Sequence, residues 1–212
     1  TERLIEQAEA VGANKLLINV NFGAMPNDLF MEQVRRFGRD VLPKLLAAYD
    51  IRRAVLIGHS DGASIAIIHA AHHPDVAAGA VLMAPHVLVE AISQQSIARI
   101  TETYERTDLR QRLARHHDHV DDAFLGWADA WLDPEFASWA SEDLLGRIDQ
   151  PLLLVQGLDD EYGTLEQVRG IARRVPGTRL LELPDCGHSP HRDQPEAVIE
   201  AVDRSEVLEA GG

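Results

Sequence analysis

Short, uninterrupted apolar runs alternate along the chain with longer segments in which apolar residues recur every three or four positions. The runs lie at 15–20, 54–58, 80–84, 152–157 and 179–183. Continuous apolar runs of this length are typical of parallel strands covered on both faces. Helical patterns occupy roughly 29–49, 63–73, 164–175 and 195–209,. This order predicts an α/β fold, a three-layer sandwich around a mostly parallel sheet of about five strands.

The first predicted helix, at 29–49, carries signals for its start and for a break. Asp28 is a candidate N-cap, and Pro43 should kink the helix or end its first part,.

The segment between the third and fourth apolar runs departs from the alternation of strands and helices. Residues 86–148 show no clear strand and contain all three tryptophans. We predict that 86–148 form a helical cap domain over the carboxyl edge of the sheet, where open α/β sheets bind ligands. Residues 1–85 and 149–212 then form the core.

Composition and net charge limit the classes of molecule that the protein is expected to bind. The chain has 212 residues and a formal net charge of −14, which opposes binding to nucleic acid or to an anionic membrane. A single cysteine, Cys186, fits a reducing compartment,, and no apolar run is long enough to span a membrane. The amino-terminal residues carry no signal-peptide pattern. We therefore expect a cytoplasmic protein that acts on a small molecule.

The clearest chemical motif follows the second apolar run. Residues 58–62 read Gly-His-Ser-Asp-Gly, which matches the G-x-S-x-G nucleophile elbow, a sharp turn between a strand and a helix. In such a turn the serine backbone is strained, and the flanking glycines are expected to avoid a steric clash. Ser60 is therefore a candidate nucleophile; the alternative is a turn serine that only caps the following helix.

A serine nucleophile needs a base and an orienting carboxylate, in the chain order Ser, Asp or Glu, His for this motif. Asp159 and Asp160 follow the run 152–157, and His188 follows the run 179–183. Because the carboxyl ends of parallel strands share one edge, these residues should meet Ser60. We favour Asp160 over Asp159 as the acid, and His188 over His191 as the base.

Other residues with reactive or metal-ligating side chains are weaker candidates for a catalytic or metal-binding role. Cys186 lacks a strand-turn-helix to present it and is expected to be a small buried residue. The histidines at 116, 117 and 119 would point in different directions on a helix, so we predict a polar surface and no metal site. We expect His59, Trp127 and Trp131 to line the substrate pocket, although the tryptophans also suit core packing. No cofactor is predicted.

From about Asp40 to Ala201 the chain resembles the α/β-hydrolases of the meta-cleavage-product hydrolase and esterase type. The resemblance is carried by LIGHSDGASIAIIHA, VLMAPHV, PLLLVQGLDDEYGT and LPDCGHSPHRDQPE. It implies Ser60 as nucleophile, Asp160 as acid, His188 as base and a cap between the strand and the acid. It also implies the backbone N–H of Asp61 as an oxyanion donor, and hydrolysis of a small ester or carbon–carbon bond through an acyl-enzyme.

The amino-terminal part departs from this family, which has further strands and a His-Gly-type oxyanion loop before the long helix. Residues 1–46 instead resemble the carboxyl-terminal end of bacterial-luciferase-like flavin monooxygenases. We therefore expect a fused or truncated hydrolase whose exposed sheet edge favours a homo-oligomer. Two alternatives to an active hydrolase are a catalytically impaired remnant without the oxyanion loop and a fragment of a flavin-dependent fusion.

Overall fold

The computed structural model describes residue 32 and residues 34–209. Its strands are β1 (Ala54–His59), β2 (Ala77–Met83), β3 (Leu152–Gly157) and β4 (Arg179–Leu183). Its α-helices are α3 (Leu42–Ala48), α4 (Asp61–His72), α5 (Ala91–Arg106), α6 (Leu109–Leu113), α7 (Val120–Leu132), α8 (Leu165–Arg174), α9 (Pro190–Asp193), α10 (Pro195–Asp203) and α11 (Glu206–Glu209). A π-helical segment, Phe37–Val41, and two 3₁₀ helices, Phe136–Ser138 and Glu142–Arg147, complete these elements.

The described strands form one parallel sheet in the order β1-β2-β3-β4. Each of them contains or overlaps a predicted apolar run. The largest difference is in β2, which begins at Ala77 and ends at Met83, whereas the predicted run spans 80–84. The predicted strand at 15–20 lies outside the described residues. The α/β fold with a parallel sheet is therefore confirmed.

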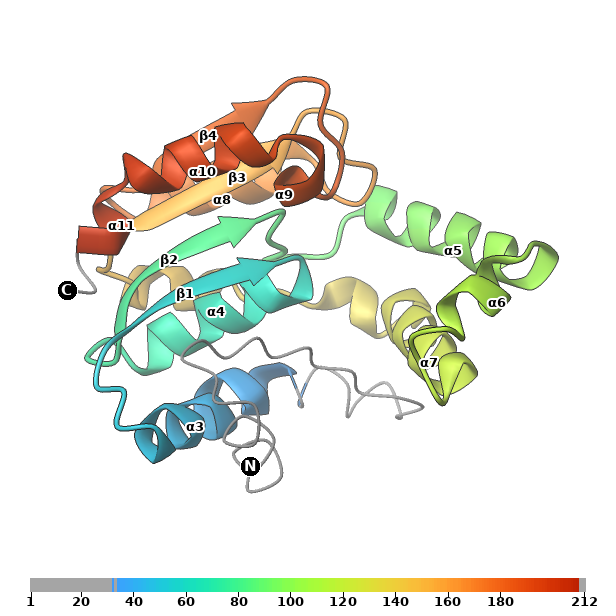
Figure 1. Cartoon of the computed structure of the whole chain (residues 1–212), viewed down its shortest axis with the longest axis horizontal. Helices are drawn as coiled ribbons and strands as arrows, with labels where there is room; N and C mark the ends of the chain where they lie inside the picture. Colours follow the sequence, from blue (N-terminus) through green and yellow to red (C-terminus); the bar gives the residue numbers. More distant parts are fainter. Residues whose placement is uncertain (1–31, 33, 210–212) are drawn as a thin grey trace.

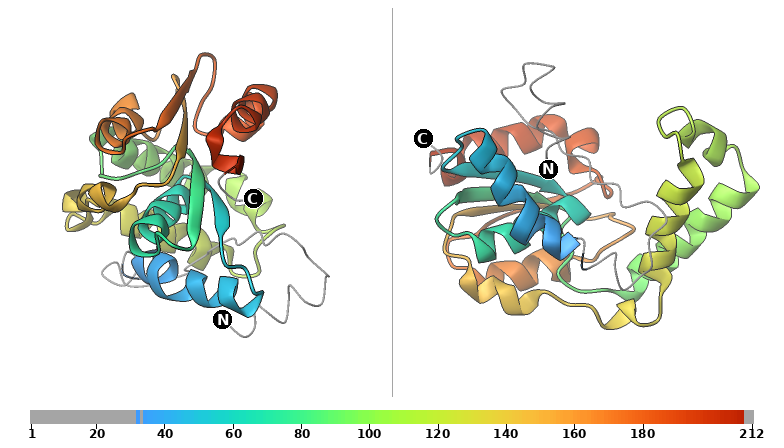
Figure 2. Two further views of the ribbon diagram at one scale, coloured as in Figure 1. Left: turned by 90° about the vertical axis from the view of Figure 1, so that its left-hand side faces the viewer. Right: turned by 90° about the horizontal axis from the view of Figure 1, so that it is seen from below.

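Helices cover both faces of the sheet and give the sandwich its three layers (Figure 2). On one face, Leu152 and Leu154 of β3 join a buried cluster with α4 and α8. On the other face, Leu153 and Val155 join a cluster that includes Val198 of α10 and Val207 of α11. Successive side chains of a strand point to opposite faces. A continuous apolar run therefore supplies both cores.

The first predicted helix is divided in the structure. A π-helical segment, Phe37–Val41, runs directly into α3, and Pro43 lies in the first turn of α3. Proline lacks a backbone N–H, so the first helical turn is the place where it disturbs the hydrogen bonding least. Pro43 thus coincides with the change from one helical form to the next. The candidate cap Asp28 lies outside the described residues.

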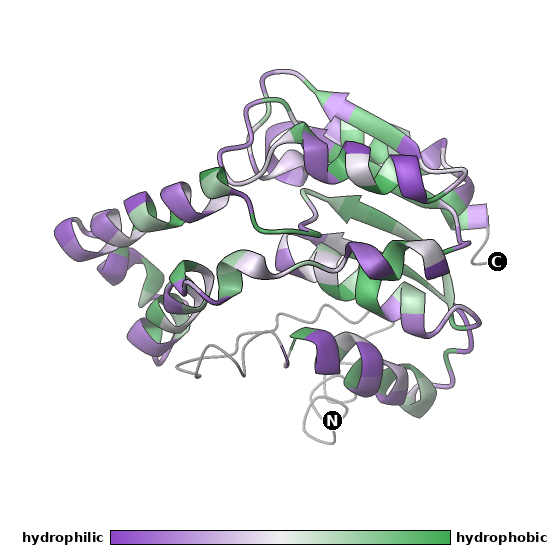
Figure 3. Ribbon diagram, turned by 180° about the vertical axis from the view of Figure 1, so that it is seen from behind, coloured by the Kyte–Doolittle hydropathy of each residue, from purple (hydrophilic) through white to green (hydrophobic). Residues whose placement is uncertain are grey.

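The segment between β2 and β3 is mainly helical, as expected from its lack of strand patterns. Figure 1 shows α5, α6 and α7 projecting from the end of the sheet. They have an apolar cluster of their own that includes Ile97, Trp131, Phe136 and Trp139. Seen from behind, strands are coloured mainly hydrophobic, whereas the helices carry many hydrophilic positions (Figure 3). The assignment of 86–148 to a separate cap domain stays a prediction.

Among the described residues, β1 and β4 are the two edge strands of the sheet, and β1 is the one nearest the amino-terminal side. Its Ile57 side chain is unusually open to solvent for a large aliphatic residue, with 65% of its surface exposed. An open strand edge is a site where another strand can pair, but the predicted homo-oligomer stays a prediction. None of the described helices is both long and apolar enough to cross a membrane.

Candidate active site

Ser60 lies in a strained turn between β1 and α4. Its backbone angles are φ 53° and ψ −124°, a region that non-glycine residues rarely adopt and that costs on the order of 1–3 kcal/mol. A Cβ added to Gly58 would lie 2.5 Å from the carbonyl oxygen of Gly62, so the turn closes only with glycine at 58. A Cβ on Gly62 would meet nothing within 4 Å. The prediction that both glycines avoid a clash is therefore wrong for Gly62.

The structure brings Ser60, His188 and Asp160 into one chain of hydrogen bonds. The Nε2 atom of His188 lies 3.0 Å from the hydroxyl oxygen of Ser60. On the other side of the ring, Nδ1 lies 2.9 and 3.0 Å from the two carboxylate oxygens of Asp160. Ser60 follows β1, Asp160 follows β3 and His188 follows β4, so all three lie at the carboxyl edge of the sheet. The arrangement is that of a nucleophile, a general base and an orienting carboxylate.

Asp160 is held in place by more than His188. It is only 7% exposed, and its oxygens accept hydrogen bonds from the side-chain amide of Gln156 at 2.6 Å and the backbone N–H of Tyr162 at 2.8 Å. Burial alone would raise the pKa of Asp160, but the hydrogen bonds with His188 and the Tyr162 N–H keep it below its usual value,. Asp160 therefore carries a negative charge beside the Nδ1 atom of His188. Asp159 is exposed.

The loop that carries His188 packs closely against the end of β3. A Cβ on Gly157 would overlap the carbonyl oxygen of Cys186, and the backbone N–H of Asp159 donates to that same carbonyl at 3.0 Å. From β1, the Nε2–H group of His59 donates to the carbonyl of His188 at 2.7 Å. Neighbouring strands thus fix the position of the His188 backbone. Cys186 is buried, as expected.

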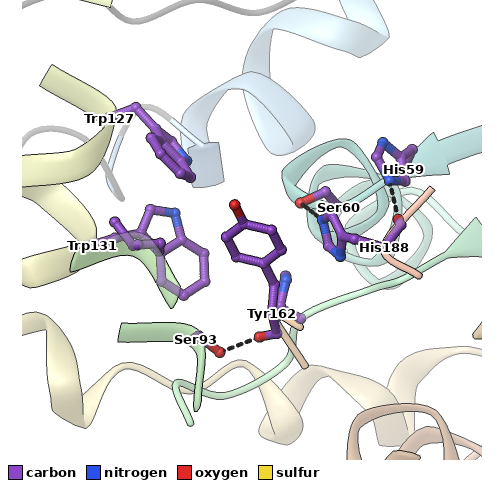
Figure 4. A pocket seen from close by; sticks show the side chains of 9 residues that line it. His59, Ser60, Ser93, Trp127, Trp131, Tyr162 and His188 are labelled. Atoms are coloured by element: carbon purple, nitrogen blue, oxygen red, sulfur yellow. Dashed lines mark hydrogen bonds between the residues drawn. The ribbon is translucent and has the colours of Figure 1, made fainter. Parts of the chain in front are cut away.

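A cavity of about 320 Å³ opens in front of Ser60 and His188. Its walls include Trp127 and Trp131 from α7, and Tyr162 from the loop after β3 (Figure 4). The remaining lining residues are His59, His86, Ser93 and Ile97. His59, Trp127 and Trp131, which we expected in the substrate pocket, therefore line this cavity, and their contact with substrate stays a prediction. Trp139 packs instead in the apolar cluster of the helical segment.

Sequence reasoning missed Tyr162 and His86 as cavity residues. The Tyr162 ring lies 4.8 Å from the His188 ring, measured between centroids, and the hydroxyl of Ser93 donates to the Tyr162 carbonyl at 2.5 Å. Burial and the nearby Glu161 raise the pKa of the Tyr162 phenol. The only signal in the sequence was its place two residues after Asp160.

His86 is a buried imidazole that the hydrogen-bond chain does not use. It is 3% exposed, and its Nδ1 atom has no hydrogen-bond partner among the described residues. The ring packs edge-on against Trp131, with centroids 5.2 Å apart. Burial lowers the pKa of His86 to about 4, and the nearby His188 adds to the effect,. His86 is therefore neutral near pH 7.

Asp61, directly after the nucleophile, is the first residue of α4. Backbone N–H groups in the first turn of a helix have no partner within it, so this N–H is available to an oxyanion. Burial raises the pKa of the Asp61 carboxyl to about 6, although His188 and the indoles of Trp131 and Trp127 lower it. The segment before residue 32, where the family's second oxyanion donor would lie, is outside the described residues.

The remaining candidates lie away from this chemistry. His191 stacks edge-on against His59, with ring centroids 4.8 Å apart, and is exposed. His116 and His119 are exposed and His117 is partly so, between α6 and α7. Within the described part of the chain, no group of three or more His, Cys, Asp or Glu side chains is arranged to hold a metal ion.

Comparison with known proteins identifies the family of the chain. A sequence model described as "Alpha/beta hydrolase family" matches residues 19–201. A pimeloyl-[acyl-carrier protein] methyl ester esterase from Chromobacterium violaceum is 27% identical over 191 residues, which cover 79% of this chain and 75% of the esterase.

Solved structures show the same fold. A hydrolase from Pseudomonas aeruginosa PA01 superposes with a TM-score of 0.59 at 25% identity, covering 80% of this chain and 70% of the other. A thermophilic esterase from Thermogutta terrifontis superposes with a TM-score of 0.60 at 21% identity, covering 94% and 77%. The family match spans most of the chain. The protein therefore belongs to the α/β-hydrolase family.

Proposed function

We propose that the protein is a serine hydrolase that cleaves a small carboxylic ester through an acyl-enzyme. The observation that carries this proposal is the continuous hydrogen-bond chain from Ser60 through His188 to Asp160. The strained backbone of Ser60 supports it, because strain of this kind gathers at functional sites.

Each group has a defined task in this mechanism. The hydroxyl oxygen of Ser60 attacks the ester carbonyl carbon while Nε2 of His188 takes its proton. The ring then bears a positive charge, which the Asp160 carboxylate stabilises from the Nδ1 side. His188 returns the proton to the leaving alcohol, and the acyl group stays on Ser60. A water, deprotonated by His188, then releases the acid and restores the serine.

The oxyanion formed in each step needs hydrogen-bond donors. The backbone N–H of Asp61 is the donor that we assign, at the positive end of the α4 dipole. Removing one such donor from an enzyme typically lowers turnover by about 10²–10³. The alternative of a catalytically impaired remnant thus predicts weak activity rather than none.

The cavity and the relatives favour an ester over a carbon–carbon bond. At about 320 Å³, the cavity is at the small end of ligand pockets, and its aromatic walls suit a small, largely apolar acyl group. The Chromobacterium violaceum relative is named as a methyl ester esterase, and we extend ester cleavage to this chain. The meta-cleavage-product type and the luciferase-like origin of residues 1–46 stay predictions. No described feature supports a flavin-dependent reaction.

The proposal is tested with a fluorophosphonate probe, which labels activated serines. We expect labelling of the unchanged protein and none of Ser60→Ala, with turnover of p-nitrophenyl butyrate lost in parallel. Ser138→Ala, which changes an exposed serine, is the matched control and should label normally. Labelling that persists in Ser60→Ala would refute Ser60 as the nucleophile. Strong Ser60-dependent turnover would rule out the impaired remnant.

A further inference from the structure

The phenol of Tyr162 is a polar group of the cavity wall that the hydrogen bonds of the site do not use. The imidazole of His59 donates to the carbonyl of His188, and the hydroxyl of Ser93 donates to the carbonyl of Tyr162. The Tyr162 hydroxyl itself makes no hydrogen bond to another described residue, although its side chain lines the cavity. A hydroxyl left without a partner in a largely apolar cavity favours a ligand that supplies one.

The Tyr162 hydroxyl points toward the place where an ester would react. Figure 4 shows it directed into the cavity, between Ser60 and Trp127. An ester attacked by Ser60 occupies the space in front of the serine hydroxyl, so part of the substrate lies beside the phenol. Burial and the nearby Glu161 raise the pKa of Tyr162. The phenol therefore keeps its proton near pH 7 and is available as a hydrogen-bond donor.

The backbone that carries the Tyr162 side chain is fixed on both sides. Its N–H donates to Oδ1 of Asp160 at 2.8 Å, and its carbonyl accepts from Ser93 of α5 at 2.5 Å. Further along the same loop, the backbone N–H and the hydroxyl of Thr164 both donate to the carboxylate of Glu90, at 2.9 and 2.6 Å. A donor on a fixed backbone loses little freedom when it binds a substrate.

The ring of Tyr162 lies on the side of the site where the alcohol leaves. In the proposed mechanism His188 returns its proton to the leaving alcohol, so that alcohol lies beside the His188 ring. The Tyr162 and His188 ring centroids are 4.8 Å apart. The donor that we assign to the carbonyl oxygen, the Asp61 N–H, belongs instead to α4. The alcohol part of the ester is therefore the part that the phenol is placed to contact.

Building on the proposed esterase activity, we propose that the Tyr162 hydroxyl donates a hydrogen bond to the alcohol part of the substrate. The substrates are then small esters whose alcohol carries an oxygen acceptor a few atoms from the ester group. Trp127 and Trp131 contact the carbon atoms of such a substrate, whereas the phenol selects its oxygen atom. Tyr162 is thus a residue that determines specificity.

The test compares methoxyethyl acetate with butyl acetate, following acetate release by NMR. The two esters share an acyl group, and their alcohols have the same length and differ by one ether oxygen in place of a methylene. Tyr162→Phe removes only the hydroxyl and keeps the ring against His188. We expect this variant to lower the ratio of kcat/KM values, methoxyethyl over butyl ester, about 2- to 10-fold. A ratio equal to that of the unchanged protein would overturn the proposal.

Two controls locate the effect. Tyr104→Phe removes a phenol hydroxyl of α5 that donates to Asp121 at 2.7 Å and lies outside the cavity lining, so it should leave the ratio unchanged. A second ester pair, methyl methoxyacetate and methyl butyrate, moves the ether oxygen to the acyl part, and its ratio should be the same in Tyr162→Phe as in the unchanged protein. An equal change in Tyr104→Phe, or a larger change for the acyl pair than for the alcohol pair, would overturn the assignment.

A binding measurement on Ser60→Ala, which has no nucleophile, separates this proposal from the proposed activity. By ligand-detected NMR, Tyr162→Phe added to Ser60→Ala should weaken binding of methoxyethyl acetate about 2- to 10-fold relative to butyl acetate. That result supports the contact even if the unchanged protein hydrolyses neither ester, an outcome that would count against the esterase alone. Equal weakening of both esters, or no weakening of either, would overturn the contact whatever the activity.

Discussion

Acid should destabilise this protein through His86. The ring is 3% exposed, and burial lowers its pKa from 6.5 to about 4 in the folded state. In the unfolded chain the same histidine takes up a proton near its ordinary pKa of about 6.5. As the pH falls below 6.5, the histidine therefore binds a proton in the unfolded state but stays unprotonated in the folded state. The free energy of unfolding drops until the pH reaches about 4.

The size of the effect follows from the difference between the two pKa values. A full difference of about 2.5 units corresponds to about 3.4 kcal/mol at 1.36 kcal/mol per unit,. Between pH 7.5 and pH 5 the free energy of unfolding falls by about 2 kcal/mol of this total. At pH 5 the histidine is mostly protonated in the unfolded state and mostly unprotonated in the folded state. Such a loss is a large share of the 5–15 kcal/mol that typically stabilises a domain.

Urea denaturation of the unchanged protein and of His86→Phe isolates this contribution. Phenylalanine keeps a ring against Trp131 and does not titrate, so carboxylates elsewhere affect both proteins alike. We expect the difference in the free energy of unfolding, unchanged protein minus variant, to fall by about 2 kcal/mol from pH 7.5 to pH 5. His116→Phe, at an exposed position, serves as the matched control and should track the unchanged protein. A difference that stays flat, or that rises toward pH 5, would refute the reasoning.

Two further predictions concern the elbow and the acid. Gly58→Ala should lower the free energy of unfolding by roughly 1–3 kcal/mol because its Cβ meets the backbone of Gly62 and Ala63,. Gly62→Ala, with open space around its Cβ, should raise it by up to about 1 kcal/mol through helix propensity,; urea titrations measure both, and equal losses would contradict the steric account. Asp160→Asn should lower kcat on p-nitrophenyl butyrate roughly 10³–10⁴-fold, because an amide favours the wrong His188 tautomer. Asp159→Asn is its control, and comparable losses in both would remove Asp160 from the role of acid.

The sequence predicts the sheet well because buried parallel strands leave a strong local signal. A polar residue follows each of the runs 54–58, 152–157 and 179–183 within two positions, so their carboxyl ends are marked. The start of β2 at Ala77 is not marked, because the small residues Ala77, Ala78 and Gly79 fit a strand or a helix equally well. The order of Ser60, Asp160 and His188 is predictable for the same reason: each follows a marked strand end.

The cavity wall could be predicted only in part. Tryptophans stand out in composition, and two of the three line the cavity. His86 and Tyr162 lie in loops whose residues face solvent, core or cavity according to the packing of distant elements, which no local pattern records. The motif also predicts a steric need for glycine at position 62 that the structure does not show. The spacing of a motif does not distinguish a glycine that is sterically required from one that is not.

The reacting groups and the walls of the cavity are anchored by different kinds of bonds. Main-chain hydrogen bonds continue past the strand ends, from Ser60 N–H to the Met83 carbonyl at 2.9 Å and from Leu158 N–H to the Leu183 carbonyl at 2.8 Å. Main-chain bonds survive almost any change of side chain. Trp127 and Trp131, by contrast, lie on α7 and contact their neighbours through side-chain packing in the apolar clusters. Mutations in α7 can therefore change the shape of the cavity while the distance between the Ser60 hydroxyl oxygen and His188 stays the same. This makes the fold a suitable starting point for the directed evolution of enzymes with new substrate ranges.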